Sequence, residues 1–331
     1  MPPASGYFLG CLLGFAFFLG FVLGGAVRAE EIAATDEVTW LERLRLSAEA
    51  LQWSDELVRH DWRLQRRPGT DTCRILDPRD RTVCTGSGDE CRRTFLELQA
   101  SGRIEPVAGP TVIVLHGLGE GRRVMRPLVE HLRVSLDATV LAFGYASTQA
   151  AIADHGRALA SVVAGLPAGT RVSFVGHSLG NLVVRSWIGQ ADTTYLERLD
   201  RVVMLGPPNQ GSELARKASR VWVLATLSQG AARDLVVDWD TVAPTLPAPT
   251  CPFGIVAGGT GDATGFSPLL DGDDDAVVTV AETRLTGAND FFLVPVRHAD
   301  MMKSPTVQDA VTAFLTTGRF PMRRAEDGAA P

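Results

Sequence analysis

The sequence predicts an α/β fold with a mainly parallel sheet covered by helices on both faces, plus an N-terminal helix and hairpin appendage. Two features of residues 109–331 carry this prediction. Short apolar runs alternate with longer stretches of helical periodicity, which is typical of βαβ units. Within these runs, apolar and polar residues do not alternate, as expected for strands that are buried on both faces.

The N-terminal segment is a candidate targeting or anchoring element. No charged residue occurs from Gly6 to Val27, and an apolar helix of that length crosses a bilayer. Val27-Arg28-Ala29 also fits a signal-peptide cleavage site. We therefore expect residues 1–29 to be a signal peptide or a membrane anchor. The chain is then exported, and it is either anchored facing outside the cytoplasm or periplasmic or secreted.

Residues 30–108 are expected to form an appendage to the main domain. Apolar periodicity predicts a helix over residues 35–66, which ends at Arg67-Pro68-Gly69. A hairpin is predicted over residues 72–86, and a short helix over 91–101. The sequence does not indicate what this appendage is for.

Two cysteines of the predicted hairpin are placed symmetrically about its turn. If Pro78-Arg79 is a two-residue loop, Cys73 lies opposite Cys84, which is compatible with a disulfide. The pair would then occupy a hydrogen-bonded site of the ladder, where the strands are farther apart. Two free thiols are therefore the alternative.

Residues 109–331 are expected to form one catalytic domain. Apolar runs predict strands at residues 111–115, 138–143, 171–175, 201–205, 252–256 and 291–295. Helical periodicity predicts helices at residues 121–135, 148–165, 178–190 and 305–316.

The third predicted strand leads directly into Gly176-His177-Ser178-Leu179-Gly180 and the helix after it. A strand, a tight turn and a helix form the context that the Gly-x-Ser-x-Gly nucleophile elbow requires. The turn exposes the serine hydroxyl, and the helix N-terminus favours developing negative charge. Ser178 is therefore the predicted nucleophile. The alternative is a glycine-rich turn whose serine only caps the helix.

Residues 110–320 resemble the lipase and esterase branch of the α/β hydrolases, in particular the bacterial triacylglycerol-lipase-like proteins. The motifs that carry the resemblance are His116-Gly117-Leu118-Gly119, the Ser178 pentapeptide, residues 206–212, Asp275-Ala276-Val277-Val278 and His298. The resemblance implies the α/β-hydrolase fold and a serine hydrolase that cleaves carboxylic esters through an acyl-enzyme. Residues 30–108 lie outside it.

The base follows from the order of the chain. A serine hydroxyl needs a neighbouring base, usually histidine. In α/β hydrolases the acid and then the histidine come after the serine. Of the six histidines, only His298 follows Ser178, and it lies between the last predicted strand and the last predicted helix. We therefore predict that His298 is the base.

The acid is expected after the fifth strand. Related lipases carry Asp-Gly-x-Val there, and this chain has Asp275-Ala276-Val277-Val278, so the resemblance implies Asp275. If the glycine is needed for its backbone angles, Asp274 is the alternative. The acidic run at residues 271–275 could instead bind calcium or form a solvated loop. Its spacing does not match an EF-hand loop.

The oxyanion that forms on an ester carbonyl needs two preplaced donors. The backbone N–H of Leu179, directly after the nucleophile, is one predicted donor. By resemblance, the residue after His116-Gly117 supplies the other, which is Leu118. The alternative for residues 116–119 is an ordinary glycine-rich turn.

Residues 207–251, between the fourth and fifth strands, are rich in apolar side chains. They form either a lid and acyl-pocket wall or ordinary core. Their apolar members are Val221, Trp222, Val223, Leu224, Leu227, Leu235, Val236, Val237 and Trp239. Ser212 is expected to cap a helix. A small-molecule or lipid ester is the expected substrate.

Charge and composition limit the partners. The net charge is −6 and no long run of Lys or Arg occurs, so we expect no nucleic-acid binding. The predicted triad requires no cofactor and no metal. The membrane is an expected partner only through the N-terminal segment, if it is uncleaved. Acyl transfer or thioester cleavage by the same triad is an alternative activity, and a non-catalytic membrane-tethered binding protein is a further one.

Overall fold

The computed structural model describes residues 51–219 and 230–322. The predicted signal peptide or anchor at residues 1–29 lies outside these ranges, as do residues 35–50 of the expected helix. Within the described ranges, no helix has the length and apolar character needed to span a membrane.

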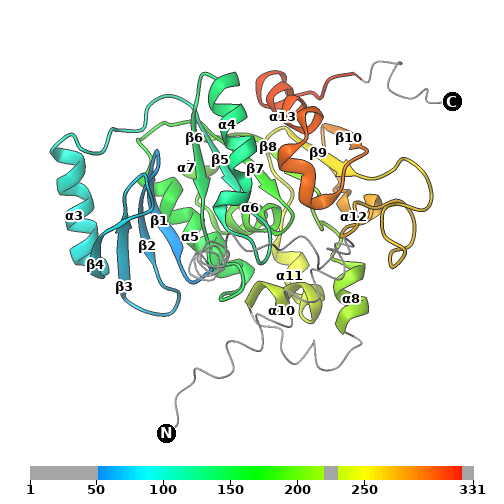
Figure 1. Ribbon diagram of the computed structural model, residues 1–331, viewed down its shortest axis with the longest axis horizontal. Coiled ribbons are helices and arrows are strands. Elements are labelled where there is room, and N and C mark those ends of the chain that lie inside the picture. The colour runs from blue at the N-terminus through cyan, green and yellow to red at the C-terminus, as the bar shows by residue number, and fades with distance from the viewer. Residues whose placement is uncertain (1–50, 220–229, 323–331) are drawn as a thin grey trace, which may run out of the picture.

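A six-stranded sheet forms the centre of the molecule, in the order β10-β9-β8-β7-β5-β6 with all neighbours parallel (Figure 1). Its strands are β5 (Thr111–Leu115), β6 (Thr139–Phe143), β7 (Val172–His177), β8 (Leu199–Leu205), β9 (Phe253–Gly258) and β10 (Asp290–Val294). The predicted parallel sheet is therefore confirmed, with small shifts at the strand ends.

Helices cover both faces of this sheet. α5 (Ile152–Gly165) and α6 (Leu179–Gln190) pack on the face that carries Phe174. α4 (Arg126–Ser135) and α13 (Pro305–Thr317) pack on the opposite face, which carries Val175. Phe174 and Val175 are neighbours on β7 and are both fully buried. A strand with two covered faces is apolar throughout, which explains the continuous apolar runs of the sequence.

Shorter helices connect the main elements. They are η1 (Arg122–Met125), α7 (Thr193–Leu196), α8 (Glu213–Ser219), α10 (Gly230–Val236), α11 (Trp239–Val242), η2 (Ala243–Thr245), α12 (Val280–Thr283) and η3 (His298–Lys303). Ser212 accepts the Ala215 N–H at 3.1 Å, so it caps α8 as predicted. In the segment between β8 and β9, Leu235 is core and Val237 is exposed, whereas Val221 to Leu227 lie outside the described residues.

A second, antiparallel sheet lies at the end of the molecule beside β6 (Figure 1). Its strands are β1 (Ser54–Arg59), β2 (Trp62–Arg66), β3 (Thr72–Leu76) and β4 (Thr82–Ser87), and α3 (Gly88–Ala100) packs on it. The predicted hairpin over residues 72–86 and the helix over 91–101 are confirmed. We call β1–β4 and α3 the N-terminal sheet.

The predicted helix over residues 35–66 is wrong for residues 54–66, which form β1 and β2. The cause is the double burial of β1. Leu57 packs into the small core under α3, whereas its neighbour Val58 packs into the main core. A strand that is buried on both faces loses the period of two, and its apolar residues then resemble a helical stripe.

The expected opposition of Cys73 and Cys84 is also wrong. The turn closes with a bond from the Asp77 N–H to the Arg81 carbonyl, so its loop is longer than two residues. A bulge next to Ile75 shifts the register, so Ile75 opposes Cys84. The described cysteines are free thiols, and the Cys84 and Cys91 sulfur atoms lie 3.6 Å apart.

We expect Cys73 and Cys91 to resist alkylation in the folded chain. Both are fully buried, and burial raises the pKa of Cys73 to about 11 and that of Cys91 to about 12. The reactive thiolate is therefore scarce. Maleimide labelling with peptide mapping should mark these two residues only after denaturation. Equal labelling of folded and unfolded chain would contradict this arrangement.

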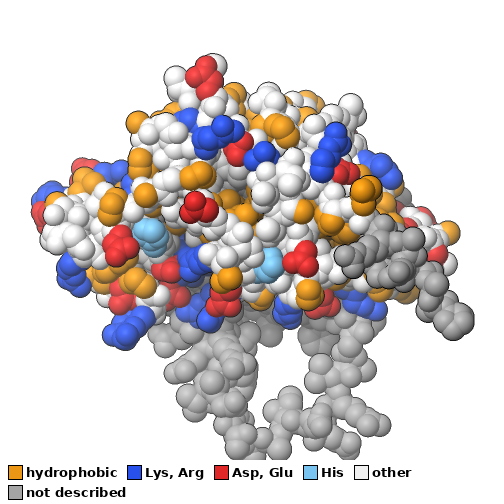
Figure 2. Space-filling view, turned by 90° about the horizontal axis from the view of Figure 1, so that it is seen from above, with side chains coloured by type: hydrophobic (Ala, Val, Ile, Leu, Met, Phe, Trp, Pro, Cys, Tyr) orange, Lys and Arg blue, Asp and Glu red, His pale blue; other side chains and the backbone are white. Residues whose placement is uncertain are grey.

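On the face drawn in Figure 2, Lys and Arg side chains are interspersed with Asp and Glu rather than gathered into a patch of one sign. Ion pairs at the surface of the described residues include Arg126 with Glu130, Arg133 with Asp61, and Arg171 with Asp200. Such exposed pairs contribute little to stability, so the fold depends mainly on its apolar cores.

Candidate active site

Ser178 lies at the turn between β7 and α6. Its φ of 52° and ψ of −122° lie outside the regions that L-residues favour. The turn is fixed by bonds from the Ser178 N–H to the Leu205 carbonyl (2.9 Å) and from the Asn181 N–H to the Ser178 carbonyl (3.1 Å). This strained strand–turn–helix geometry is that of a nucleophile elbow.

His298 and Asp275 are joined by a hydrogen bond of 2.7 Å between Nδ1 and Oδ2. His298 begins η3 after β10, and Asp275 lies in the loop after β9. Both are buried. The second carboxylate oxygen of Asp275 accepts the N–H groups of Val277 (3.0 Å) and Val278 (2.8 Å). The carboxylate is therefore held from two sides, with one oxygen turned to the imidazole.

Asp274, the alternative acid, faces elsewhere. Its carboxylate accepts the N–H groups of Ala276 (2.6 Å) and Ser267 (3.3 Å). Asp273 likewise accepts the Thr260 N–H at 2.7 Å. The loop carboxylates are thus engaged by backbone donors. Within residues 51–219 and 230–322, no group of three or more His, Cys, Asp or Glu side chains is arranged to hold a metal ion.

The pKa of His298 is raised above its ordinary value. Burial acts to lower it, because a buried imidazolium loses hydration. The charge and hydrogen bond of Asp275, together with the charge of Glu120, outweigh that effect. Since Nδ1 faces a carboxylate oxygen, the neutral ring carries its proton there and leaves Nε2 as the basic nitrogen.

Gly206, which follows β8, lets the backbone come close to this pair. A Cβ at this position would lie 2.9 Å from His298 Nδ1 and 3.0 Å from Asp275 Oδ2. The φ of Gly206 is also positive, at 50°. Any larger residue would therefore be strained and would press on the pair.

The loop after β5 lies beside Ser178. A Cβ added to Gly117 would be 3.2 Å from the Ser178 Cβ. The N–H groups of Leu118 and Leu179 donate to no other residue that the structure describes. Both N–H groups are therefore unengaged within the described residues. We call residues 116–121 the oxyanion loop, after the role that the sequence predicts for it.

A family model described as "Putative serine esterase (DUF676)" matches residues 146–208, which include the Ser178 turn. The lipase BlEst2 of Bacillus licheniformis, in its mature form, is 20% identical with a TM-score of 0.52, over 65% of this chain and 96% of the lipase.

The chain has the α/β-hydrolase fold. The propeptide form of the same lipase gives 20% identity and a TM-score of 0.53 over 68% of this chain, which spans about half (54%) of that structure. No curated protein is significantly similar in sequence. The family match supports a hydrolase that acts on esters.

Two residues near the Ser178 turn are not identified by the sequence. Glu120 accepts the Gly117 N–H (2.8 Å) and lies 3.2 Å from His177 Nδ1. His177 in turn places Nε2 at 3.2 Å from the His298 carbonyl, and its ring lies 4.5 Å from the His298 ring. Burial acts to raise the pKa of Glu120, but His177 and the hydrogen bonds lower it to about 2. Glu120 and His177 thus join the oxyanion loop, the elbow and the His298 loop.

The alanine that stands where related lipases have glycine keeps the backbone that glycine would adopt. Ala276 has a φ of 85°. A left-handed backbone costs an L-residue roughly 1–2 kcal/mol. The turn is held by the Asp275 N–H bond to the Val278 carbonyl (3.1 Å). Asp275 therefore keeps its position despite the substitution.

We expect Ala276→Gly to stabilise the protein by about 0.2–1.2 kcal/mol. Relief of the left-handed strain exceeds the loss of one buried methyl, which costs about 0.8 kcal/mol. Denaturant midpoints of the full chain measure this. Ala158→Gly in α5 is the matched control, and it should destabilise by about 0.5–1 kcal/mol. Destabilisation by both substitutions would contradict the strain at residue 276.

Proposed function

We propose that this chain is a serine hydrolase that cleaves carboxylic esters of small or lipid molecules through an acyl-enzyme. The observation that carries the proposal is the buried His298–Asp275 hydrogen bond beside the strained Ser178 turn. β7, β9 and β10 belong to one parallel sheet, and Ser178, Asp275 and His298 lie in the segments that follow the carboxyl ends of these strands. The His177 ring, next to Ser178 in sequence, lies against His298.

The proposed reaction has two halves. The Ser178 oxygen attacks the ester carbonyl, and His298 Nε2 takes the hydroxyl proton and returns it to the leaving alcohol. Water then loses a proton to His298 and attacks the acyl-enzyme, which releases the acid and restores Ser178. Asp275 orients the imidazole and stabilises its charged form. The N–H groups of Leu118 and Leu179 stabilise the oxyanion of each tetrahedral intermediate.

Export of the chain, with residues 1–29 acting as a signal peptide or a membrane anchor, also belongs to the proposal. Its support is the uncharged stretch from Gly6 to Val27. A lipid ester would suit an enzyme that remains anchored at a membrane. A series of p-nitrophenyl esters of increasing chain length, assayed with and without an alcohol acceptor, tests acyl preference and separates hydrolysis from acyl transfer.

We expect a fluorophosphonate probe to label the full chain at Ser178. Ser178→Ala should abolish the label, because no other serine lies on the elbow. Ser173→Ala, at the buried beginning of the same strand, is the control and should label like the unaltered chain. Folded, unaltered chain without any label would favour the non-catalytic binding protein. Equal label on Ser178→Ala would refute the nucleophile.

We expect kcat/KM to fall on acidification through a pKa above about 6.5, the ordinary value for histidine. His298 must be neutral to accept a proton, and its pKa is raised. In Asp275→Asn the imidazolium loses its partner charge, so this acid limb should move to lower pH while kcat falls by about 10⁴-fold.

Asp273→Asn is the matched control for this pH profile. Asp273 lies in the same loop, but its carboxylate bonds to Thr260 and Gly261 N–H groups rather than to His298. Its acid limb should stay in place. An unmoved limb in Asp275→Asn would show that another group controls the profile.

A further inference from the structure

The N-terminal sheet, whose purpose the sequence does not indicate, contacts the rest of the chain on both sides of the oxyanion loop. We propose that it positions this loop, with Asp80 holding one end and β1 holding the other through the turn at residues 144–147. This inference rests on the proposed function, because a positioned oxyanion loop matters only if Ser178 attacks a carbonyl.

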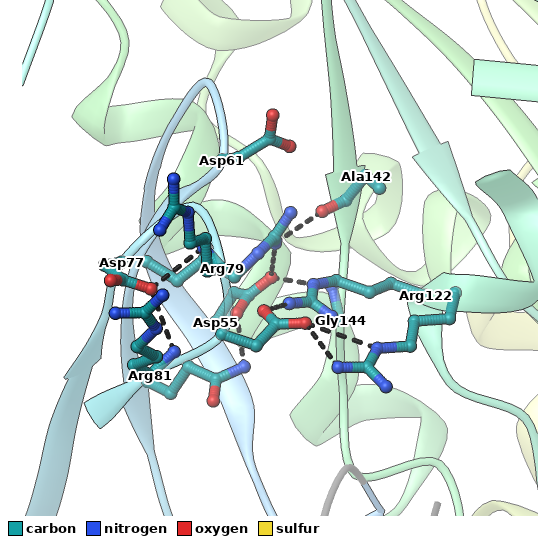
Figure 3. Close-up of polar contacts among 12 residues, drawn as sticks. Asp55, Asp61, Asp77, Arg79, Arg81, Arg122, Ala142 and Gly144 are labelled. Atoms are coloured by element: carbon teal, nitrogen blue, oxygen red, sulfur yellow. Dashed lines mark hydrogen bonds and ion pairs between the residues drawn. The ribbon is translucent and has the colours of Figure 1, made fainter. Parts of the chain in front are cut away.

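The first contact is a buried ion pair between β1 and β2 that reaches the turn after β6. Asp55 Oδ2 accepts from Arg63 Nη1 (2.6 Å) and from the Gly144 N–H (2.7 Å) (Figure 3). Arg63 Nη1 also donates to the Ala142 carbonyl at 2.6 Å. Ser54 Oγ accepts the Ala146 N–H at 3.1 Å. Asp55 and Arg63 are almost completely buried, so these bonds form in a medium of low dielectric constant and resist displacement by water.

The turn at residues 144–147, which β1 holds, also holds the oxyanion loop. The Tyr145 hydroxyl donates to the His116 carbonyl (2.6 Å), and the Tyr145 N–H donates to His116 Nε2 (3.3 Å). The two rings are stacked with their centroids 4.2 Å apart. Ser147 Oγ accepts the Gly119 N–H at 3.1 Å. Leu118, whose N–H is the proposed donor, therefore lies between two residues that the turn fixes.

The second contact comes from the turn between β3 and β4. Asp80 forms ion pairs with Arg122 and with Arg123, the latter at 2.7 Å. These arginines begin η1, directly after the oxyanion loop. Burial acts to raise the pKa of Asp80, but the two arginines outweigh it and lower the pKa. Asp80 is therefore ionised, and the pairs persist, across the neutral range.

The two contacts converge on one spot. A Cβ on Gly144 would lie 3.3 Å from Asp55 Oδ2 and 3.5 Å from Arg122 Cδ, and Figure 3 shows Asp55, Gly144 and Arg122 close together. Both ends of the oxyanion loop are thus fastened to the same sheet. Small displacements of a catalytic group are costly to the rate, so a loop held at both ends favours stabilisation of the oxyanion.

Asp80→Asn tests the proposal on the full chain. Asn tolerates the left-handed backbone of this position, where φ is 61°, so the turn keeps its shape while the charge is removed. We expect kcat to fall about three- to tenfold at unchanged KM, less than the ~10²–10³-fold loss for removing a donor. The Ki of an alkyl trifluoromethyl ketone, whose serine adduct carries an oxyanion, should rise by a similar factor.

Asp61→Asn is the matched control. Asp61 lies in the turn between β1 and β2, and its carboxylate hydrogen-bonds to Arg133 in α4 (3.0 Å) rather than to Arg122 or Arg123. It should leave kcat and Ki unchanged. If Asp80→Asn does not fold, a second pair of variants tests the proposal. Tyr145→Phe removes the hydroxyl that bonds to His116, and Tyr195→Phe, the control, removes an unrelated hydroxyl on α7.

The outcomes separate the two proposals. The positioning role is overturned if the unaltered chain is active and labelled by the fluorophosphonate probe, and if Asp80→Asn and Asp61→Asn have equal kcat. A fall in melting temperature without any change in kcat or Ki also overturns it, since the sheet would then only stabilise the fold. Unaltered chain that neither hydrolyses esters nor reacts with the probe refutes the proposed function itself.

Discussion

The hydrogen bond between His298 and Asp275 is the constraint around which this end of the sheet is built. A buried carboxylate is unfavourable unless polar partners surround it, and Asp275 has the imidazole on one oxygen and two backbone N–H groups on the other. The lack of a side chain at Gly206 and the left-handed backbone at Ala276 both follow from the need to fit these groups into one small volume.

Much of the main domain could be predicted because its physics is local. Strands covered on both faces are apolar throughout, and a serine between glycines after such a strand marks a sharp turn into a helix. The order of the chain then left one histidine after Ser178. The choice between Asp275 and Asp274 as the predicted acid is harder, because the sequence does not reveal whether Ala276 adopts the backbone angles of a glycine. The neighbouring hydrogen bonds decide that.

What the sequence could not supply depends on contacts between distant segments. β1 resembles a helix because Leu57 and Val58 are buried in different cores, and no pattern along the chain reports a second core. The register of Cys84 depends on a bulge. Glu120 and His177 are 57 positions apart, so only the fold reveals that they meet. Their proximity matters because it links the oxyanion loop, the turn at Ser178 and the loop that carries His298.

The double burial of β1 also bears on how the molecule comes apart. Val58 belongs to the same apolar cluster as α5 and α6, and Arg63 satisfies a carbonyl of β6. Removal of the first hundred residues would expose apolar side chains of the main domain and leave some of its backbone polar groups without hydrogen-bond partners. The boundary that the sequence indicates near residue 109 therefore does not divide the protein into two units that unfold separately. The two sheets are bound to melt together, in one transition.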